Sequence, residues 1–145
     1  MAADNQLTID QVDTVIYHSP CSDGLGAALA VYMYMREHHP DREVMYIPGI
    51  HGSKPPCVTG KHVLLCDFTY RVEHMKKMIS EAANLLIIDH HKTAMEDLKD
   101  LDPKYKHFNL TRSGAALTWM WAFPDRRLPK LIEYIEDRDL WVRKL

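Results

Sequence analysis

The stretch Leu85-Leu86-Ile87-Ile88-Asp89-His90-His91 joins a continuous apolar run directly to three polar, titratable side chains. An apolar run without alternation is typical of a strand that is covered on both faces, as in a parallel sheet. We therefore expect residues 85–88 to form a buried strand that ends at the polar triplet. Two adjacent histidines after such a strand are hard to explain by packing, and histidine is the commonest metal ligand in proteins.

The segments around this strand alternate between strand-like and helix-like patterns. Strands are predicted at residues 12–18, 43–47, 63–66 and 85–88, and helices at residues 24–37, 72–83, 114–122 and 130–137. Residues 48–60 are predicted to form a loop, because they are rich in proline and glycine and a proline nitrogen cannot donate to a sheet. This order predicts an α/β fold with a doubly wound, mainly parallel β-sheet flanked by helices, followed by a helical C-terminal part.

The composition limits the class of protein. A chain of 145 residues fits a single domain, residues 1–145. The formal net charge of -2 gives no general basic field, so any nucleic-acid partner should be short or locally held. The three cysteines include no Cys-x-x-Cys pair, which argues against a disulfide framework and a thiolate zinc site. Without a signal peptide or a membrane-spanning apolar run, the sequence predicts a soluble cytoplasmic protein that does not contact a membrane.

Polar side chains follow three of the predicted strands. His18 ends the first strand, with Cys21 and Asp23 just beyond it; Asp67 follows the third, and Asp89 opens the triplet after the fourth. Because the carboxyl ends of parallel strands meet at one edge of a sheet, we expect these side chains to lie together. A single aspartate after a strand is usually only a turn residue, so the coincidence carries the argument. Clustered carboxylates repel one another unless a cation neutralises them, and the cluster therefore predicts a metal site.

At these residues, and over nearly the whole chain, the sequence resembles the DHH phosphoesterase superfamily. The superfamily includes RecJ-type single-strand exonucleases, nanoRNA and dinucleotide phosphodiesterases, and exopolyphosphatases. The matching motifs, in chain order, are His18-Ser19-Pro20-Cys21-Ser22-Asp23-Gly24, Leu64-Leu65-Cys66-Asp67-Phe68, Leu86-Ile87-Ile88-Asp89-His90-His91 and Ile135-Glu136-Asp137-Arg138-Asp139. The resemblance implies a DHH-type fold and a dinuclear metal site.

The resemblance also implies roles for single residues. The implied metal ligands are His18, Asp23, Asp67, His90 and Asp137, and the implied catalytic set is Asp67, Asp89, His90 and His91. Asp67 would bridge two ions, and His91 would face the substrate phosphate. Asp89 would orient a metal-bound imidazole. Asp139 is a rival to Asp137 as the last ligand, since both lie at a helix end.

The first motif departs from the usual His-x-Asp-x-Asp order of the family, because Cys21 occupies the place of the first carboxylate. A thiolate could bind a softer ion such as zinc or iron, whereas a buried free cysteine is more often a small inert hydrophobe. Without Cys21, one ion would have only His18 and Asp67 as protein ligands. We expect Mn2+, with Mg2+, Co2+ or Zn2+ as alternatives, at one or two ions per site.

The function implied is a metal-dependent phosphoesterase that hydrolyses small nucleotides or short oligonucleotides through a metal-activated water. The alternatives are a catalytically weak metal- or nucleotide-binding module, and an exopolyphosphatase or pyrophosphatase with the same site chemistry. His51 and Arg112 are weaker candidates for contact with the substrate, since a loop histidine or a surface arginine is usually only solvated.

Enzymes of this superfamily usually carry a DHH-associated domain after the last motif, and that domain is absent from these 145 residues. We therefore expect either that the sequence is part of a longer protein or that a partner completes the cleft. A homodimer is one form that such a partnership could take.

Overall fold

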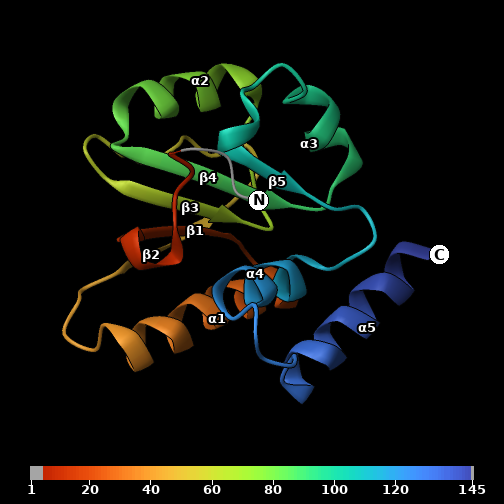
Figure 1. The fold of residues 1–145 in the computed structure, drawn as a ribbon. Coiled ribbons are helices and arrows are strands. Elements are labelled where there is room, and N and C mark those ends of the chain that lie inside the picture. Colours follow the sequence, from red (N-terminus) through yellow and green to blue (C-terminus); the bar gives the residue numbers. More distant parts are fainter. Residues whose placement is uncertain (1–4, 145) are drawn as a thin grey trace.

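Five parallel strands form a sheet at the centre of the molecule, in the spatial order β2-β1-β3-β4-β5 (Figure 1). A computed structural model describes residues 5–144 of the chain. The strands are β1 (Thr14–His18), β2 (Met45–Gly49), β3 (His62–Cys66), β4 (Asn84–Asp89) and β5 (Lys106–Phe108). The predicted α/β fold with a mainly parallel sheet is confirmed.

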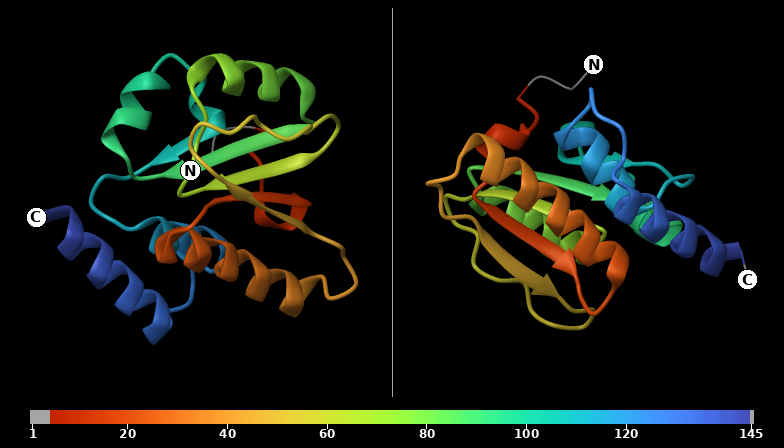
Figure 2. Two further views of the ribbon diagram at one scale, coloured as in Figure 1. Left: turned by 180° about the vertical axis from the view of Figure 1, so that it is seen from behind. Right: turned by 90° about the horizontal axis from the view of Figure 1, so that it is seen from below.

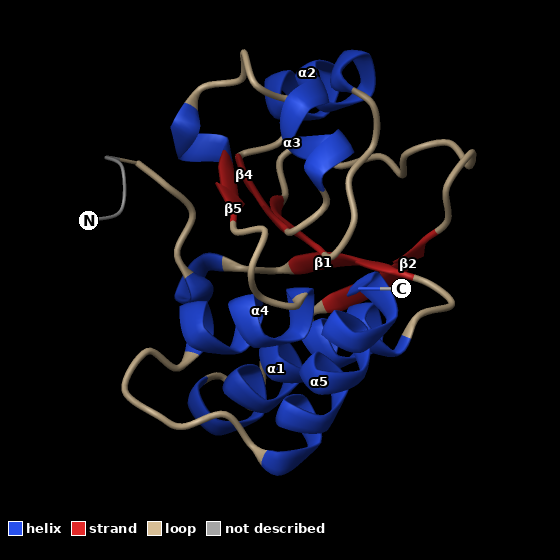
Figure 3. Ribbon diagram, turned by 90° about the vertical axis from the view of Figure 1, so that its right-hand side faces the viewer, coloured by secondary structure: helices blue, strands red, loops and turns tan. Residues whose placement is uncertain are grey.

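Helices cover both faces of the sheet, as a doubly wound fold requires (Figures 2 and 3). One face carries α1 (Ser22–His38), α4 (Gly114–Ala122) and α5 (Lys130–Lys144), and the other carries α2 (Val72–Glu81) and α3 (Lys92–Asp97). Two short 3-10 turns, η1 (Ile9–Gln11) and η2 (Pro103–Tyr105), complete the fold. Among residues 5–144, none of these helices has both the length and the apolar character needed to cross a membrane.

The position of β4 inside the sheet, between β3 and β5, explains the unbroken apolar run. Leu86 and Ile88 pack into the core beneath α1 and α4, whereas Leu85 and Ile87 pack into the core beneath α2. All four side chains are fully buried. Burying each of them contributes about 1.5–3 kcal/mol, so a polar residue at any of these positions would destabilise one face of the sheet.

Most predicted elements occur in the structure, with differences at weakly patterned segments. Helix α4 has the predicted bounds, but α5 continues past residue 137 to Lys144. The prediction that residues 48–60 are all loop was wrong at its start, because Pro48 and Gly49 belong to β2. Strand β2 lies at the edge of the sheet, where a proline is tolerated. Helix α3 and the three-residue strand β5 were not predicted, since neither has a distinctive apolar pattern.

The order of the strands places a topological switch point between β1 and β3. The chain leaves β1 through α1 on one face and leaves β3 through α2 on the other face, so this is the switch point where ligands bind in such sheets. Tyr17 pairs with Cys66, and Cys66 pairs with Ile88. The residues that follow these three positions, His18, Asp67 and Asp89, are therefore aligned at the carboxyl edge.

Helix α1 begins very close to the end of β1, and Gly24 permits the approach. A Cβ atom at this position would lie 2.2 Å from the backbone carbonyl oxygen of His18. No side-chain movement can relieve contact with backbone, so the first turn of α1 would have to shift. That turn carries Asp23, one of the predicted metal ligands.

We predict that Gly24→Ala destabilises the protein by about 1–3 kcal/mol, as overpacking of a core does. Alanine in place of a helical glycine normally stabilises by about 0.5–1 kcal/mol, so the clash reverses the usual sign. Urea denaturation measures the change. The exposed Ser22 of the same turn provides the control Ser22→Ala. Equal midpoints for the two variants would contradict the packing argument.

Candidate metal centre

Asp67 lies at the centre of the aligned residues. It follows β3 with a backbone φ of 58°, in the left-handed region that non-glycine residues rarely adopt, and its side chain is 1% exposed. The two carboxylate oxygens face different neighbours. Oδ1 lies 2.7 Å from Nε2 of His90, and Oδ2 lies 3.6 Å from Nδ1 of His18 and 3.7 Å from Sγ of Cys21. Although burial favours the neutral acid, the His18 and His90 rings hold the pKa of Asp67 well below its usual range.

The first group of ligands surrounds His90, whose side chain is 1% exposed. Its Nε2 also lies 3.1 Å from Oδ2 of Asp23, and its Nδ1 lies 3.7 Å from Oδ2 of Asp139. Burial opposes a charge on this ring, but the Asp23 and Asp67 carboxylates outweigh burial and raise the pKa of His90 to about 10. A proton on His90 thus holds together carboxylates that a metal cation would otherwise bind.

Helix α4 fixes Asp23 in this group. The carboxylate accepts hydrogen bonds from the backbone N–H groups of Gly114 (2.9 Å) and Ala115 (2.8 Å), which are free at a helix start. A Cβ atom on Gly114 would lie 2.7 Å from Cβ of Asp67, so a glycine is needed for α4 to approach. Ser113 caps the same helix start, since its Oγ accepts a hydrogen bond from the backbone N–H of Ala116.

The second group consists of His18, Cys21 and Asp67, whose ligand atoms all lie within 4.8 Å of one another. Nδ1 of His18 is buried, yet it has no hydrogen-bond partner among residues 5–144. Burial raises the pKa of the Cys21 thiol, so the sulfur stays neutral without a nearby cation. A buried imidazole nitrogen without a partner, facing a carboxylate and a thiol, fits a metal ligand. Both groups therefore fit a divalent cation.

Asp89 acts on the triplet through a single oxygen. Its Oδ1 accepts hydrogen bonds from Nδ1 of His91 (2.7 Å) and from the backbone N–H of His90 (2.8 Å). The bond from Asp89 raises the pKa of His91. The ring that Asp89 contacts directly is thus that of His91, whereas its bond to His90 is made only to the backbone. His91 is exposed and lines a cavity of about 410 Å³.

The chain is similar to a known protein family over most of its length. The model of the family described as "DHH family, N-terminal domain" matches residues 14–136. The chain belongs to the DHH family. It is 35% identical, over 147 aligned residues, to the uncharacterized protein R106 of Acanthamoeba polyphaga mimivirus, and the match covers 94% of this chain and 35% of that protein. Its fold is similar to that of an uncharacterized protein from Helicobacter pylori G27, with a TM-score of 0.67 at 12% identity.

The structural match covers 90% of this chain and 43% of the Helicobacter pylori chain. The DHH chain therefore spans about a third of the curated relative and less than half of the structural neighbour. Membership of the family places the chain in a superfamily of metal-dependent phosphoesterases. Both similar proteins are uncharacterized, so neither supplies a substrate.

The weaker candidates of the DHH site differ in their surroundings. The His51 ring lies against that of His18, with ring centroids 5.0 Å apart, and lines the same cavity as His91. Arg112 instead donates two hydrogen bonds to the Glu136 carboxylate, at 2.9 and 3.0 Å. Contact of Arg112 with a phosphate stays a prediction. Asp137 is exposed on α5, outside the described ligand groups, whereas Asp139 joins the group of Asp23 and His90.

Sequence reasoning missed several residues around the centre. Arg71 and Thr93 line the cavity beside His91, but both precede or begin helices and carry no local motif. Glu136 holds Arg112 and also accepts a hydrogen bond from the backbone N–H of Ser113. Its position inside the last motif was the one available signal.

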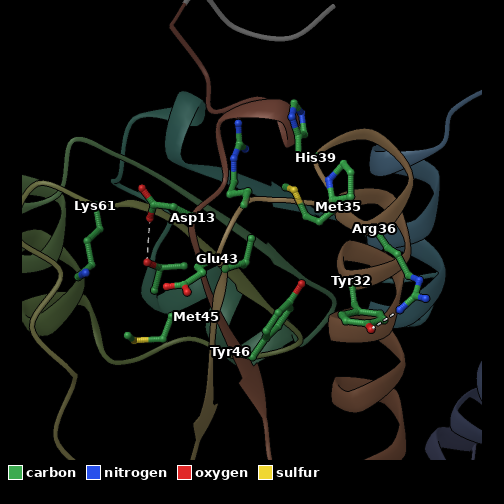
Figure 4. Close-up of a pocket in the computed structure, with 13 residues that line it drawn as sticks. Asp13, Tyr32, Met35, Arg36, His39, Glu43, Met45, Tyr46 and Lys61 are labelled. Carbon is green, nitrogen blue, oxygen red and sulfur yellow. Dashed lines mark hydrogen bonds between the residues drawn. The ribbon is translucent and has the colours of Figure 1, made fainter.

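A cavity of about 790 Å³ lies at the opposite edge of the sheet, near the amino ends of β1 and β2 (Figure 4). Its lining includes Tyr32, Arg36, Tyr46 and Lys61, and Arg36 donates a hydrogen bond to the Tyr32 hydroxyl. None of the aligned metal-ligand candidates lines this cavity. It is therefore separate from the DHH site.

We predict that metal binding releases a proton from His90. Despite burial, the carboxylates raise the pKa of this ring to about 10, so the ring is charged in neutral solution and must lose a proton before it binds a cation. Below that pH, release of this one proton should raise the apparent affinity for Mn2+ about tenfold for each pH unit. Calorimetry of Mn2+ binding in buffers of different ionisation enthalpy counts the protons released. The count should fall by one in His90→Gln, and an unchanged count would rule out this linkage.

Proposed function

We propose that this DHH domain hydrolyses phosphoester bonds of small nucleotides or short oligonucleotides by attack of an activated water. The observation that carries the proposal is the position of Asp67, whose two buried oxygens face two separate ligand groups. Divalent cations, when bound, lower the pKa of a water and offset charge on the phosphate. Asp67 would hold a cation on each side, at the crevice where this type of sheet binds ligands.

The residues around this centre supply binding and orientation. Asp89 fixes the direction of the His91 ring and favours its charged form. A charged His91 at the mouth of the cavity can donate a hydrogen bond to a phosphate oxygen. Asp23, held by two backbone N–H groups of α4, keeps its oxygens in place without adjusting when a ligand enters.

The cavity beside His91 favours a small substrate. Its volume of about 410 Å³ is typical of sites for small molecules. Phe68 and Tyr70 provide apolar lining, and Arg71 provides a positive charge. This combination suits a nucleotide with one or two bases. The net charge of -2 over the whole chain argues against long polyphosphate or nucleic acid.

The donor atoms of the first group favour Mn2+ as its ion, because carboxylates with one imidazole suit manganese and magnesium. We assign the last acidic position of this group to Asp139, since Asp137 is exposed and Asp139 lies 3.7 Å from His90. We also place the protein in a reducing, cytoplasmic compartment, where its three free cysteines stay thiols.

We predict that Asp139→Asn weakens Mn2+ binding by at least about tenfold, because it removes a negative charge from the group. The matched variant Asp137→Asn lies on the same helix but outside the described groups, so its affinity should change less than about twofold. Electron paramagnetic resonance of free Mn2+ measures both affinities. A larger loss in Asp137→Asn would reassign the last position to Asp137.

We predict that Asp67→Asn lowers kcat/KM by about 1,000-fold or more, since several kcal/mol of transition-state stabilisation depend on the cations it would hold. Asparagine tolerates the left-handed backbone, so circular dichroism should show the native fold, although loss of the ion pair with His90 lowers the unfolding midpoint. The assay follows product release from dinucleotides, short RNA, short single-stranded DNA, pyrophosphate and polyphosphate with Mn2+. Asp125→Asn, at an exposed position, is the control.

The same assay separates the alternative functions. The chain spans about a third of its curated relative, so the assay includes any longer native form. Cys21 in the second group favours the alternative of a weak metal-binding module. Metal binding without turnover of any substrate, in both forms, would support that module and overturn the proposed hydrolase.

A further inference from the structure

Cys21 lies in a different environment from the other cysteines of the chain. Cys66 is fully buried in the core, and Cys57 is exposed. Cys21 occupies the N-cap position of α1, but its side chain makes no capping hydrogen bond within the described residues. Its sulfur instead points to Oδ2 of Asp67. Neither packing nor helix capping explains this direction.

Two of the three distances in the second group are close to those between ligands of one tetrahedral ion. Zinc binds oxygen, nitrogen and sulfur at about 2.0–2.3 Å, which places tetrahedral ligand atoms about 3.3–3.5 Å apart. Oδ2 of Asp67 lies 3.6 Å from Nδ1 of His18 and 3.7 Å from Sγ of Cys21. These separations are long for strong hydrogen bonds and close to the tetrahedral spacing. Three protein donors leave a fourth position for water or a substrate oxygen.

The two groups that lie on either side of Asp67 therefore differ in chemistry. The group of Asp23, His90 and Asp139 offers carboxylates and one imidazole, which suit manganese or magnesium. The group of His18, Cys21 and Asp67 adds a thiol, and a thiolate selects a softer ion. We propose that the centre is heteronuclear, with Zn2+ bound by His18, Cys21 and Asp67 and a harder ion beside His90. This inference rests on the proposed function, because it assumes that both groups hold a cation.

Binding of zinc converts the Cys21 thiol to a thiolate, and the proton passes to solvent. Affinity alone does not test the proposal, because zinc binds most sites more tightly than manganese does. The decisive measurements are of the reactivity and the absorption of the Cys21 sulfur. A thiolate bound to zinc is a poorer nucleophile toward alkylating reagents, and a thiolate bound to Co2+ gives a near-ultraviolet charge-transfer band.

The first experiment alkylates the wild-type protein with iodoacetamide and maps the labelled cysteines by mass spectrometry. One equivalent of Zn2+ should slow labelling of Cys21 by about tenfold or more, whereas Mn2+ should not slow it. The exposed Cys57 of the same molecule is the internal control. Equal labelling of Cys21 with and without zinc would overturn the proposal, as would equal protection by both ions.

The second experiment titrates metal-free protein with Co2+ under anaerobic conditions. The charge-transfer band should appear in the wild type and in Cys57→Ser, and it should be absent from Cys21→Ser. Circular dichroism checks the fold of each variant, and the wild-type labelling decides the question if Cys21→Ser does not fold. A band that persists in folded Cys21→Ser would overturn the proposal.

Neither experiment measures hydrolysis, so the two proposals fail separately. Zinc bound at Cys21 without turnover of any phosphoester would overturn only the proposed function. Turnover with Mn2+, without zinc protection of Cys21, would overturn only the heteronuclear centre.

Discussion

The buried carboxylate of Asp67 is the constraint on which the site depends. A carboxylate removed from water is costly unless charges or hydrogen bonds compensate it. At 1% exposure, Asp67 is compensated by His90 on one oxygen and faces His18 and Cys21 with the other. Its left-handed backbone is one more cost, of about 1–3 kcal/mol, concentrated where the ligands converge. Packing of the surrounding core must offset this unfavourable free energy of the Asp67 backbone.

The parallel sheet provides the alignment that such a cluster requires. Consecutive pairing of β1, β3 and β4 brings three strand ends to one level, and the continuous apolar runs fix that register from both faces. Helix α4 then approaches through Gly114 and directs its first N–H groups at Asp23. Strand ends thus supply most of the candidate ligands, and one helix start orients Asp23. The opposite edge of the sheet, with its own cavity, takes no part.

The sequence predicted those features that local pattern encodes. The apolar runs of β3 and β4 and the polar residues after them gave the sheet, its covered faces and the cluster. The choice between Asp137 and Asp139 depends on the rotation of α5 about its axis, which tertiary packing decides. Ile132 and Ile135 pack toward α1, and Asp139 lies seven residues after Ile132, on the same face. Helical spacing would have favoured Asp139 over Asp137 for this face if the helix had been extended past residue 137. Strand β5 could not be predicted, because its three partly polar residues are too few to show a hydrophobic periodicity.

Without a cation, the two carboxylate oxygens of Asp67 differ in how well their neighbours offset the buried negative charge. On the His90 side, a proton holds the imidazole 2.7 Å from Oδ1, and a cation must displace that proton. On the other side, the neutral thiol of Cys21 is only a weak donor at 3.7 Å, and Nδ1 of His18 has no hydrogen-bond partner among residues 5–144. A cation on this side displaces no strong internal bond. In the proposed heteronuclear centre, Cys21 would lower the negative charge of the site while three donor atoms still converge. The cysteine would then change the ion preference of this position without abolishing it.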